Sequence, residues 1–143
     1  MRRLLKKYWG GILWAPFLFL AIPLAQEPAV ATVTPPPAKA LRVWVGTASW
    51  YGQGFQGQPT ASGEPFDMNA DTAAEPNLPF GSVLRLTNMR TRKTQLVRVN
   101  DRGPYVDGRD IDVTYRVACQ LGMIGGGVSR LRIELLEVPP RHE

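Results

Sequence analysis

The stretch 100–105, which reads Asn-Asp-Arg-Gly-Pro-Tyr, combines residue types that could act on a carbohydrate. Apolar and polar residues alternate just before it, which predicts a strand that delivers the Asp101 carboxylate onto a turn formed by Gly103 and Pro104. A carboxylic acid can protonate the oxygen of a glycosidic bond, and the ring of Tyr105 could line a sugar site. The alternative is that Asp101 only caps the turn, as Asp often does.

Further short motifs lie around this stretch in a fixed order. Together with Asn100-Asp101-Arg102-Gly103-Pro104, they closely resemble the RlpA (rare lipoprotein A) family over about residues 45–138. The resemblance implies a mainly β fold, a single six-stranded double-psi β-barrel of the kind found in RlpA, expansin and barwin-like proteins, with one or two short helices. The motifs are Ser49-Trp50-Tyr51-Gly52, residues 60–67, Thr72-Ala73-Ala74-Glu75, Leu78-Pro79-Phe80-Gly81 and residues 108–112.

The resemblance also implies a reaction, because characterised RlpA proteins are lytic transglycosylases of bacterial peptidoglycan. In that reaction one acidic residue protonates the leaving oxygen and then accepts a proton from the C6 hydroxyl of the same sugar, which closes a 1,6-anhydro ring. The acid must hold a proton near neutral pH, so an apolar wall or a second carboxylate has to raise its pKa. Two other functions stay open: a non-catalytic peptidoglycan-binding or expansin-like wall-loosening module, and a scaffold for a division or envelope protein.

Two residues are the leading candidates for the acid. Asp101 is the first choice, although an ion pair with Arg98 or Arg102 would lower its pKa and make it a poor acid. Glu64 is the second choice, because it follows Gly63 on a loop from which a long side chain can reach a groove. We expect Asp101, Glu64 and Glu75 to line one open groove.

The other carboxylates have structural alternatives. Asp67 is a supporting carboxylate or a turn cap. Asp112 resembles a strand aspartate that is important in expansins, but a structural role at a helix entry is favoured. Glu75 stands where RlpA proteins commonly carry His, and an ionised Glu cannot donate a hydrogen bond. It could raise the pKa of Glu64 or Asp101 by repulsion, or it could leave a site that only binds glycan.

Aromatic, amide and cationic side chains complete the predicted substrate site. Alternation along a strand places neighbours on opposite faces, so we expect one of Trp50 and Tyr51 in the core and the other, Tyr51, in the groove. Arg102 and Arg109 are candidates for holding acetamido or lactyl carboxylate groups, or they pair with Asp107 or Asp110. The candidate substrate-binding residues are Trp50, Tyr51, Asn100, Arg102, Tyr105 and Arg109.

The first residues predict export. Basic residues before position 8 and an apolar stretch at 11–25 are typical of a signal peptide over 1–31, cleaved after Ala31 or Ala25; a retained anchor is the alternative. A Pro-rich linker at 32–40, a barrel domain at 41–138 and a tail at 139–143 follow. The expected location is the periplasm or cell envelope.

The net charge and the cysteine and histidine counts limit which ligands and covalent links we expect. The net charge is +5, but four of the 17 basic residues and one of the 12 acidic residues precede position 32, which leaves +2. That charge is too small to indicate nucleic-acid binding. One Cys and one His exclude an intrachain disulfide and a Cys/His metal site. We expect no metal, no cofactor and no lipid anchor, a monomer, and a buried, inert Cys119.

Hydrophobic periodicity and turn residues place the elements. Strands are predicted at 41–50, 82–88, 95–100, 110–113 and 128–138. A single helical turn is expected at 71–75. A helix is predicted at 115–121, with Thr114 as its N-cap and Gly122 at its end.

Overall fold

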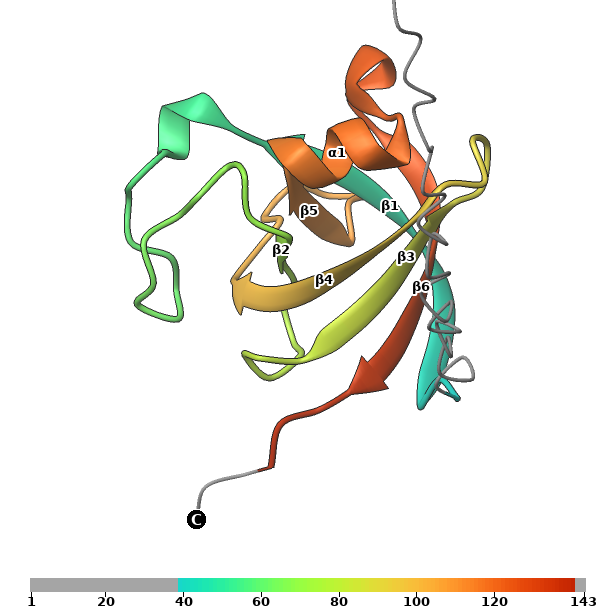
Figure 1. The fold of residues 1–143 in the computed structure, drawn as a ribbon, viewed down its shortest axis with the longest axis horizontal. Helices are drawn as coiled ribbons and strands as arrows, with labels where there is room; N and C mark the ends of the chain where they lie inside the picture. Colours follow the sequence, from blue (N-terminus) through green and yellow to red (C-terminus); the bar gives the residue numbers. More distant parts are fainter. Residues whose placement is uncertain (1–38, 141–143) are drawn as a thin grey trace, which may run out of the picture. The chain divides into compact units, whose positions relative to one another are not determined.

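The computed structural model describes residues 39–140, so the predicted leader and almost all of the predicted linker lie outside the described residues. Figure 1 shows the order of the elements along this part of the chain. The elements are β1 (Arg42–Tyr51), η1 (Gln53–Phe55), β2 (Thr72–Ala74), β3 (Val83–Asn88), β4 (Thr94–Asp101), β5 (Ile111–Thr114), α1 (Tyr115–Leu121), η2 (Ile124–Gly126) and β6 (Ser129–Glu137).

The strands close into a six-stranded barrel in the order β1-β5-β2-β4-β3-β6. The pairs β1–β5 and β2–β4 are parallel, and the other four pairs are antiparallel. The barrel predicted from the sequence is confirmed. Its closure matters for function, because it brings the carboxyl end of β1 beside β5 and places β2 alone between β5 and the carboxyl end of β4.

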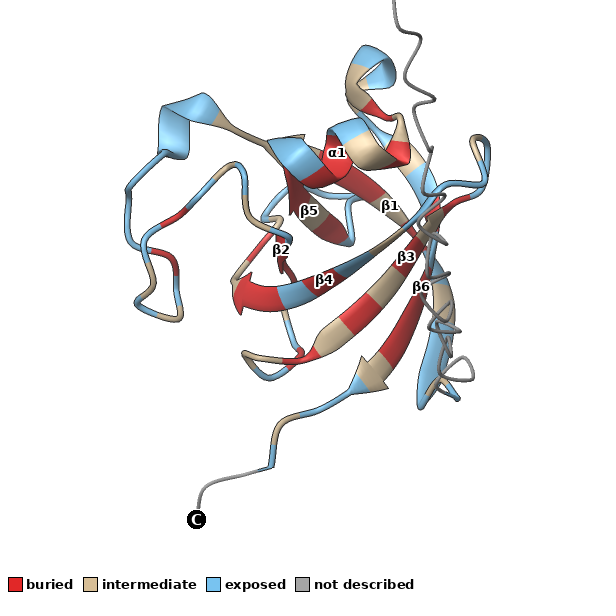
Figure 2. Cartoon of the chain, viewed as in Figure 1, coloured by how far each residue is buried: buried red, intermediate tan, exposed pale blue. Residues whose placement is uncertain are grey.

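Buried residues alternate with more exposed ones along β3 and over parts of β4 and β6, as Figure 2 shows. In β3 the pattern is strict: Leu84 and Leu86 are fully buried, while their neighbours are half-buried. Ile133 of β6 and the inner face of α1 complete the core. Each such side chain contributes about 1.5–3 kcal/mol through removal from water. The result is a rigid base for the loops at the barrel end.

Strand β2 corrects the sequence prediction, because residues 71–75 do not form a helical turn. Residues Thr72–Ala74 form a short strand between β4 and β5, and all three are buried. Pairing on both sides supplies the backbone hydrogen bonds that a helical turn would have made within itself. Three residues are too few for a periodic pattern, so this tertiary pairing cannot be read from the sequence.

Helix α1 has the predicted bounds, and Thr114 is its N-cap. The Thr114 hydroxyl accepts a hydrogen bond from the Val117 N–H at 3.5 Å and donates one to the Ala70 carbonyl at 2.6 Å. Gly122 ends the helix in the left-handed region, with φ of 69°, where glycine carries no steric cost. Among the described residues, no helix is both long and apolar enough to cross a membrane.

The prediction that Cys119 is buried is wrong, because the residue is exposed. Helical periodicity explains the difference: Val117, Ala118 and Leu121 share the buried face of α1, and position 119 falls on the opposite face together with Tyr115.

A buried ion pair links β3 and β6 on the barrel wall. Both Glu134 carboxylate oxygens accept hydrogen bonds from Arg85 at 2.8 Å, and Arg132 approaches Oε2 at 2.5 Å. These contacts, with that of Arg85 the largest, lower the pKa of Glu134 to about 2 even though only 4% of the residue is exposed. Because the folded-state pKa is depressed, the stabilisation is present above the ordinary Glu pKa and is lost as pH falls toward 2.

Replacing Glu134 with Gln should therefore lower the free energy of unfolding by about 3 kcal/mol at neutral pH. The difference between parent and variant should shrink steadily below about pH 4 as the parent's carboxylate takes up a proton. Urea unfolding of both proteins at pH 7 and pH 3 measures this. An equal difference at the two pH values would show that the carboxylate charge does not stabilise the fold.

Candidate active site

Strand register brings two carboxylates to one end of the barrel. Ala74 of β2 pairs with Asp101 of β4 on one side and with Asp112 of β5 on the other. A β-bulge shifts the β2–β4 register between Ala73 and Ala74, so that Asp101 rather than Asn100 lies opposite Ala74. Both aspartates therefore flank Ala74, one on each side. Two strand spacings separate their backbones, which is about 9–10 Å. The small alanine leaves space between the two acidic groups.

This space is part of a cavity of about 250 Å³, which we call the acidic cavity. Asp101 and Asp112 form its acidic side, and Tyr51, Phe66 and Tyr105 contribute aromatic surface. The Tyr51 and Phe66 rings stack with their centroids 4.3 Å apart, whereas Tyr105 is 87% exposed. Paired carboxylates in an aromatic cavity are the groups that glycoside cleavage requires.

Asp101 has one oxygen committed to the backbone. Its Oδ1 accepts hydrogen bonds from the N–H groups of Ala61 and Arg102, both at 2.8 Å. Within residues 39–140, Asp101 makes no ion pair. The Arg102 guanidinium instead donates to the Glu75 carbonyl at 3.2 Å and lies 3.8 Å over the Phe80 ring. The ion pair with Arg98 or Arg102, which would make Asp101 a poor acid, is therefore not formed in this part of the chain.

Asp112 lies in a different hydrogen-bonding environment. Its Oδ1 accepts a hydrogen bond from the buried Ser49 hydroxyl, which in turn accepts one from Arg109 Nη1 at 3.1 Å. The helix entry is capped by Thr114 rather than by Asp112, and Asp112 lines the cavity. Ser49 was missed, since only the parallel β1–β5 register places it beside Asp112.

The Tyr51 hydroxyl is buried without a hydrogen-bond partner among the described residues. Burial raises its pKa well above the ordinary tyrosine value, and the charges of Asp101 and Asp112 raise it further. The hydroxyl therefore stays protonated and can donate to a ligand between the two carboxylates. Trp50 points to the other face of β1, where it packs against the core and Tyr115.

Glu64 does not line this cavity. Its two oxygens accept hydrogen bonds from Arg98 at 2.7 and 2.8 Å, and Oε2 accepts a third from Asn100 Nδ2 at 3.2 Å. These contacts, that of Arg98 first, lower the pKa of Glu64. A carboxylate held ionised in this way is a poor general acid. The expectation that Glu64 reaches the groove is wrong, and the Asn100 amide contacts Glu64 as well.

The comparisons with known proteins agree with this geometry. A model of the family described as "Lytic transglycolase" matches residues 43–133. The chain belongs to this family. The resemblance to RlpA is confirmed by relatives named "Probable endolytic peptidoglycan transglycosylase RlpA". The relative from Treponema pallidum is 54% identical over 62% of this chain and 28% of its own length. The relative from Synechocystis is 40% identical over 82% of this chain and 37% of its own length. The chain thus spans only about a third of these relatives.

Solved structures show the fold of this lytic transglycolase domain. The Streptomyces papain inhibitor matches 71% of the chain and all of its own length, with a TM-score of 0.56 and 20% identity. An expansin from Clavibacter michiganensis matches 70% of the chain and 53% of its own length, with a TM-score of 0.54 and 21% identity. At such identity the likeness concerns the double-psi barrel alone.

Glu75 is also outside the cavity of this lytic transglycolase domain. Its buried Oε2 accepts hydrogen bonds from the N–H groups of Asn77, at 2.6 Å, and Leu78. It lines a separate hollow beside Arg109 and Asp110. The predicted groove shared by Asp101, Glu64 and Glu75 is therefore wrong, because short-range hydrogen bonds and an ion pair hold the two glutamates elsewhere.

The remaining predicted residues divide between turn and cavity. Asp67 is exposed, and its Oδ1 accepts a hydrogen bond from the Asn69 N–H at 2.9 Å, so it caps a turn. Arg102 and Tyr105 line the cavity. Arg109 reaches it through Ser49, and neither arginine pairs with Asp107 or Asp110 in residues 39–140.

Proposed function

We propose that the chain is an exported domain that cleaves the MurNAc–GlcNAc bond of peptidoglycan strands by endolytic lytic transglycosylation. The observation that carries the proposal is the Asp101 carboxylate, free of ion pairs among residues 39–140, facing Asp112 across an aromatic cavity. The names of the relatives support the same substrate and reaction.

In the proposed reaction, Asp101 acts as both acid and base. Protonated Asp101 gives its proton to the glycosidic oxygen as the bond from that oxygen to C1 of MurNAc breaks. The C6 hydroxyl of the same MurNAc then attacks C1 and returns a proton to Asp101 as the new C1–O6 bond forms. The carboxyl group is restored, and no water enters the product. The hydrogen bonds from Ala61 and Arg102 to Oδ1 leave Oδ2 to exchange the proton.

Asp112 and Tyr51 have different proposed roles. Positive charge develops at C1 in the transition state of glycoside cleavage, and the Asp112 carboxylate stabilises it. The Ser49 hydroxyl fixes the orientation of that carboxylate. The Tyr51 hydroxyl, which lacks a partner among the described residues, donates to a sugar hydroxyl or acetamido oxygen. The exposed Tyr105 ring provides a stacking surface at the rim of the cavity.

The strand register supports a second candidate, an inverting hydrolase, because it leaves one strand between Asp101 and Asp112. Inverting enzymes place an acid and a base about 6.5–9.5 Å apart, with room for a water molecule. Asp101 and Asp112, on strands separated by β2, could adopt such a distance. Hydrolysis would give an ordinary reducing end rather than an anhydro end, so the product distinguishes the two reactions.

The position of Glu75 weighs against a module that only binds glycan. Glu75 takes the place of the histidine common in RlpA proteins, but its carboxylate caps the turn at residues 76–78. It therefore removes no group from the acidic cavity. Asp101 and Asp112, to which the proposal assigns the reaction, both line that cavity.

Product analysis tests the proposed function. Purified full-length protein is incubated with peptidoglycan sacculi, and the released fragments are separated and weighed by mass spectrometry. We expect internal cleavage with new 1,6-anhydromuramyl ends. If the released fragments carry only reducing ends, the protein is a hydrolase. If the protein binds sacculi but releases no fragments, it is a glycan-binding module.

Glu64 should act through the loop that orients Asp101. Its ion pair ties residue 64 to β4, and the same loop supplies the Ala61 N–H bound to Asp101. Glu64→Gln should lower the rate of anhydro-end formation by roughly ten- to a hundredfold, since small misplacements of a catalytic group have effects of this order. The pH–rate profile should keep its shape, because Glu64 is not the titrating acid.

A matched control for Glu64→Gln is Asp71→Asn. This change breaks the other exposed ion pair, Arg116–Asp71, whose residues do not line the cavity. Its rate should stay within a few fold of the parent. A change in the shape of the pH–rate profile for Glu64→Gln would instead place Glu64 among the groups that transfer protons.

A further inference from the structure

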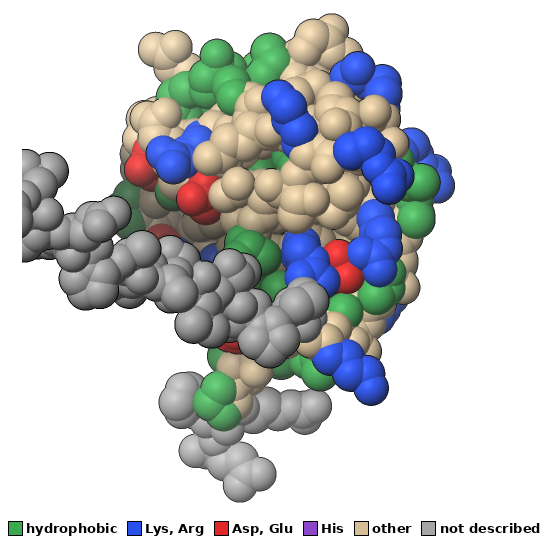
Figure 3. All heavy atoms as spheres, turned by 45° about the vertical axis from the view of Figure 1, so that its right-hand side comes forward, with side chains coloured by type: hydrophobic (Ala, Val, Ile, Leu, Met, Phe, Trp, Pro, Cys, Tyr) green, Lys and Arg blue, Asp and Glu red, His purple; other side chains and the backbone are tan. Residues whose placement is uncertain are grey.

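A second site is indicated by four cationic side chains around the β3–β4 turn and the start of β6. Arg90, Arg92 and Lys93 lie in the turn, and Arg130 lies in β6. All four residues are exposed, and none makes an ion pair within the described part of the chain. Lys and Arg side chains gather on the face of the molecule shown in Figure 3. Like charges that gather without acidic partners repel one another, so charge pairing within the described fold does not explain the cluster.

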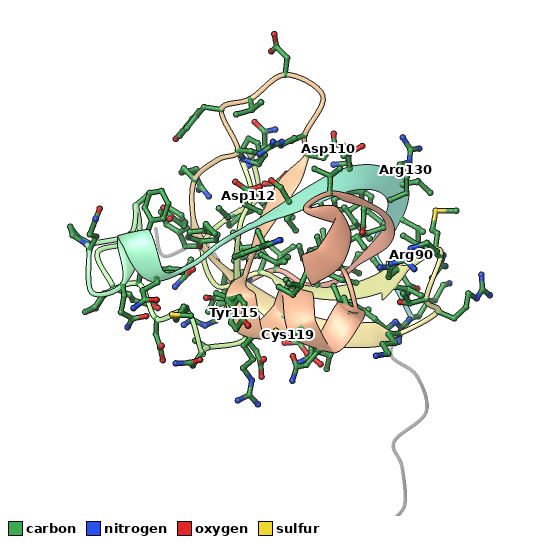
Figure 4. The ribbon with its side chains drawn as sticks, turned by 90° about the horizontal axis from the view of Figure 1, so that it is seen from above. Arg90, Asp110, Asp112, Tyr115, Cys119 and Arg130 are labelled. Atoms are coloured by element: carbon green, nitrogen blue, oxygen red, sulfur yellow. The ribbon has the colours of Figure 1, made fainter. Side chains whose placement is uncertain are left out.

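Two of these cations line a hollow of about 540 Å³, which we call the basic groove. Arg90 and Arg130 line it together with Met89, Val128 and Ser129. Met89 and Val128 are each 47% exposed and line the groove. Figure 4 shows Arg90 and Arg130 apart from Asp112, so the basic groove is separate from the acidic cavity.

The walls of the basic groove are fixed by hydrogen bonds. The Met89 N–H donates to the Arg130 carbonyl at 3.1 Å, which joins the turn to β6. The fully buried Asn88 accepts from the Arg90 N–H at 2.9 Å and donates to the Leu121 carbonyl at 3.1 Å. Arg90 Nη2 donates to the Gly122 carbonyl at 3.1 Å, so its guanidinium is held at one edge and has other N–H groups left. The groove is thus preorganised.

We propose that the basic groove binds phosphate groups of a linear anionic polymer of the cell envelope. Arg90 and Arg130 both line the groove, and each can bind phosphate, because the planar guanidinium donates in pairs to phosphate oxygens. Arg92 and Lys93 continue the positive charge along the turn, where a small single anion would leave them unneutralised. A ligand with repeated charges neutralises all four cations.

Two other polyanionic partners fit the basic groove less well. Proteins that hold single-stranded nucleic acid stack its bases on aromatic rings, and none of the described residues that line this groove is aromatic. Binding to a lipid surface requires apolar side chains that project outward among the cations. Met89 and Val128 instead line a hollow.

Binding of long-chain inorganic polyphosphate to the full chain tests the proposal without any catalytic step, so failure of the proposed function would not affect the result. Affinity is measured by calorimetry over a series of salt concentrations. Arg90→Gln combined with Arg130→Gln should weaken binding roughly tenfold or more at low salt. It should also lower the slope of log affinity against log salt by about two, one for each charge lost.

The matched control combines Lys39→Gln with Arg42→Gln, which removes two exposed charges outside the basic groove. For this control, the slope of log affinity against log salt should change by clearly less than two. Basic residues near the N-terminus are present in all variants, so they contribute equally to each measurement. Loss of the Arg90–Gly122 contact could unfold the first variant. In that case Lys93→Gln with Arg130→Gln replaces it, because the Lys93 and Arg130 side chains make no hydrogen bond among the described residues.

Five results would overturn the proposal. The first four are equal effects of the two double variants, absence of polyphosphate binding at low salt, tighter binding to phosphatidylglycerol vesicles, and tighter binding to a single-stranded oligonucleotide of matched charge. Binding of inorganic phosphate as strongly as polyphosphate, per phosphate, would reduce the ligand to a free anion and would also contradict the polymer.

Discussion

Asp101→Asn should lower the formation of 1,6-anhydro ends by at least about two orders of magnitude, the usual scale of general acid catalysis. Asparagine keeps the size of the side chain, and its carbonyl oxygen can still accept the hydrogen bonds from Ala61 and Arg102. What it loses is the proton that Asp101 gives to the glycosidic oxygen and takes back from the C6 hydroxyl.

Initial rates on purified sacculi measure the effect, and co-sedimentation with sacculi measures binding. Binding and the free energy of unfolding should be close to those of the parent, because Asp101 makes no ion pair among residues 39–140. Equal rates for parent and Asp101→Asn would remove Asp101 from the mechanism.

Asp112→Asn should lower the rate by roughly a hundred- to a thousandfold, the effect of removing one group that stabilises transition-state charge. The Ser49 hydroxyl can still donate to the asparagine oxygen, so the local geometry should persist. The loss should fall on turnover rather than on binding, since the positive charge at C1 develops only in the transition state.

Asp110→Asn is the matched control for Asp112→Asn. Asp110 is two residues away, outside the acidic cavity, and its carboxylate accepts a hydrogen bond from the Thr47 N–H at 2.7 Å. Its rate should stay within a few fold of the parent. A loss for Asp112→Asn no larger than that for Asp110→Asn would leave Asp112 with a structural role only.

The elements with a repeating pattern could be predicted from the sequence. Alternation over β3 gave its bounds to within one residue, and Thr114 and Gly122 marked the two ends of α1. The same alternation separated Tyr51, in the cavity, from Trp50, against the core. These features depend on neighbours in the chain, which the sequence displays directly.

The features that depend on pairing between distant segments could not be predicted. Strand β2 is three residues long and exists because β4 and β5 flank it. The contact of Ser49 with Asp112 requires the parallel β1–β5 register. Glu64 could be assigned to a loop, but nothing in the sequence says that Arg98 would hold it away from the cavity.

The central claim is that the acidic cavity cleaves glycan without water, and digestion of sacculi in water enriched in heavy oxygen tests it most directly. Transglycosylation forms its new bond from the C6 oxygen of the sugar, so the account predicts anhydro ends that carry no label. Hydrolysis places one oxygen from water at C1 of each new reducing end. New reducing ends that carry heavy oxygen, formed by the parent and lost in Asp101→Asn, would contradict the account and identify the cavity as that of a hydrolase.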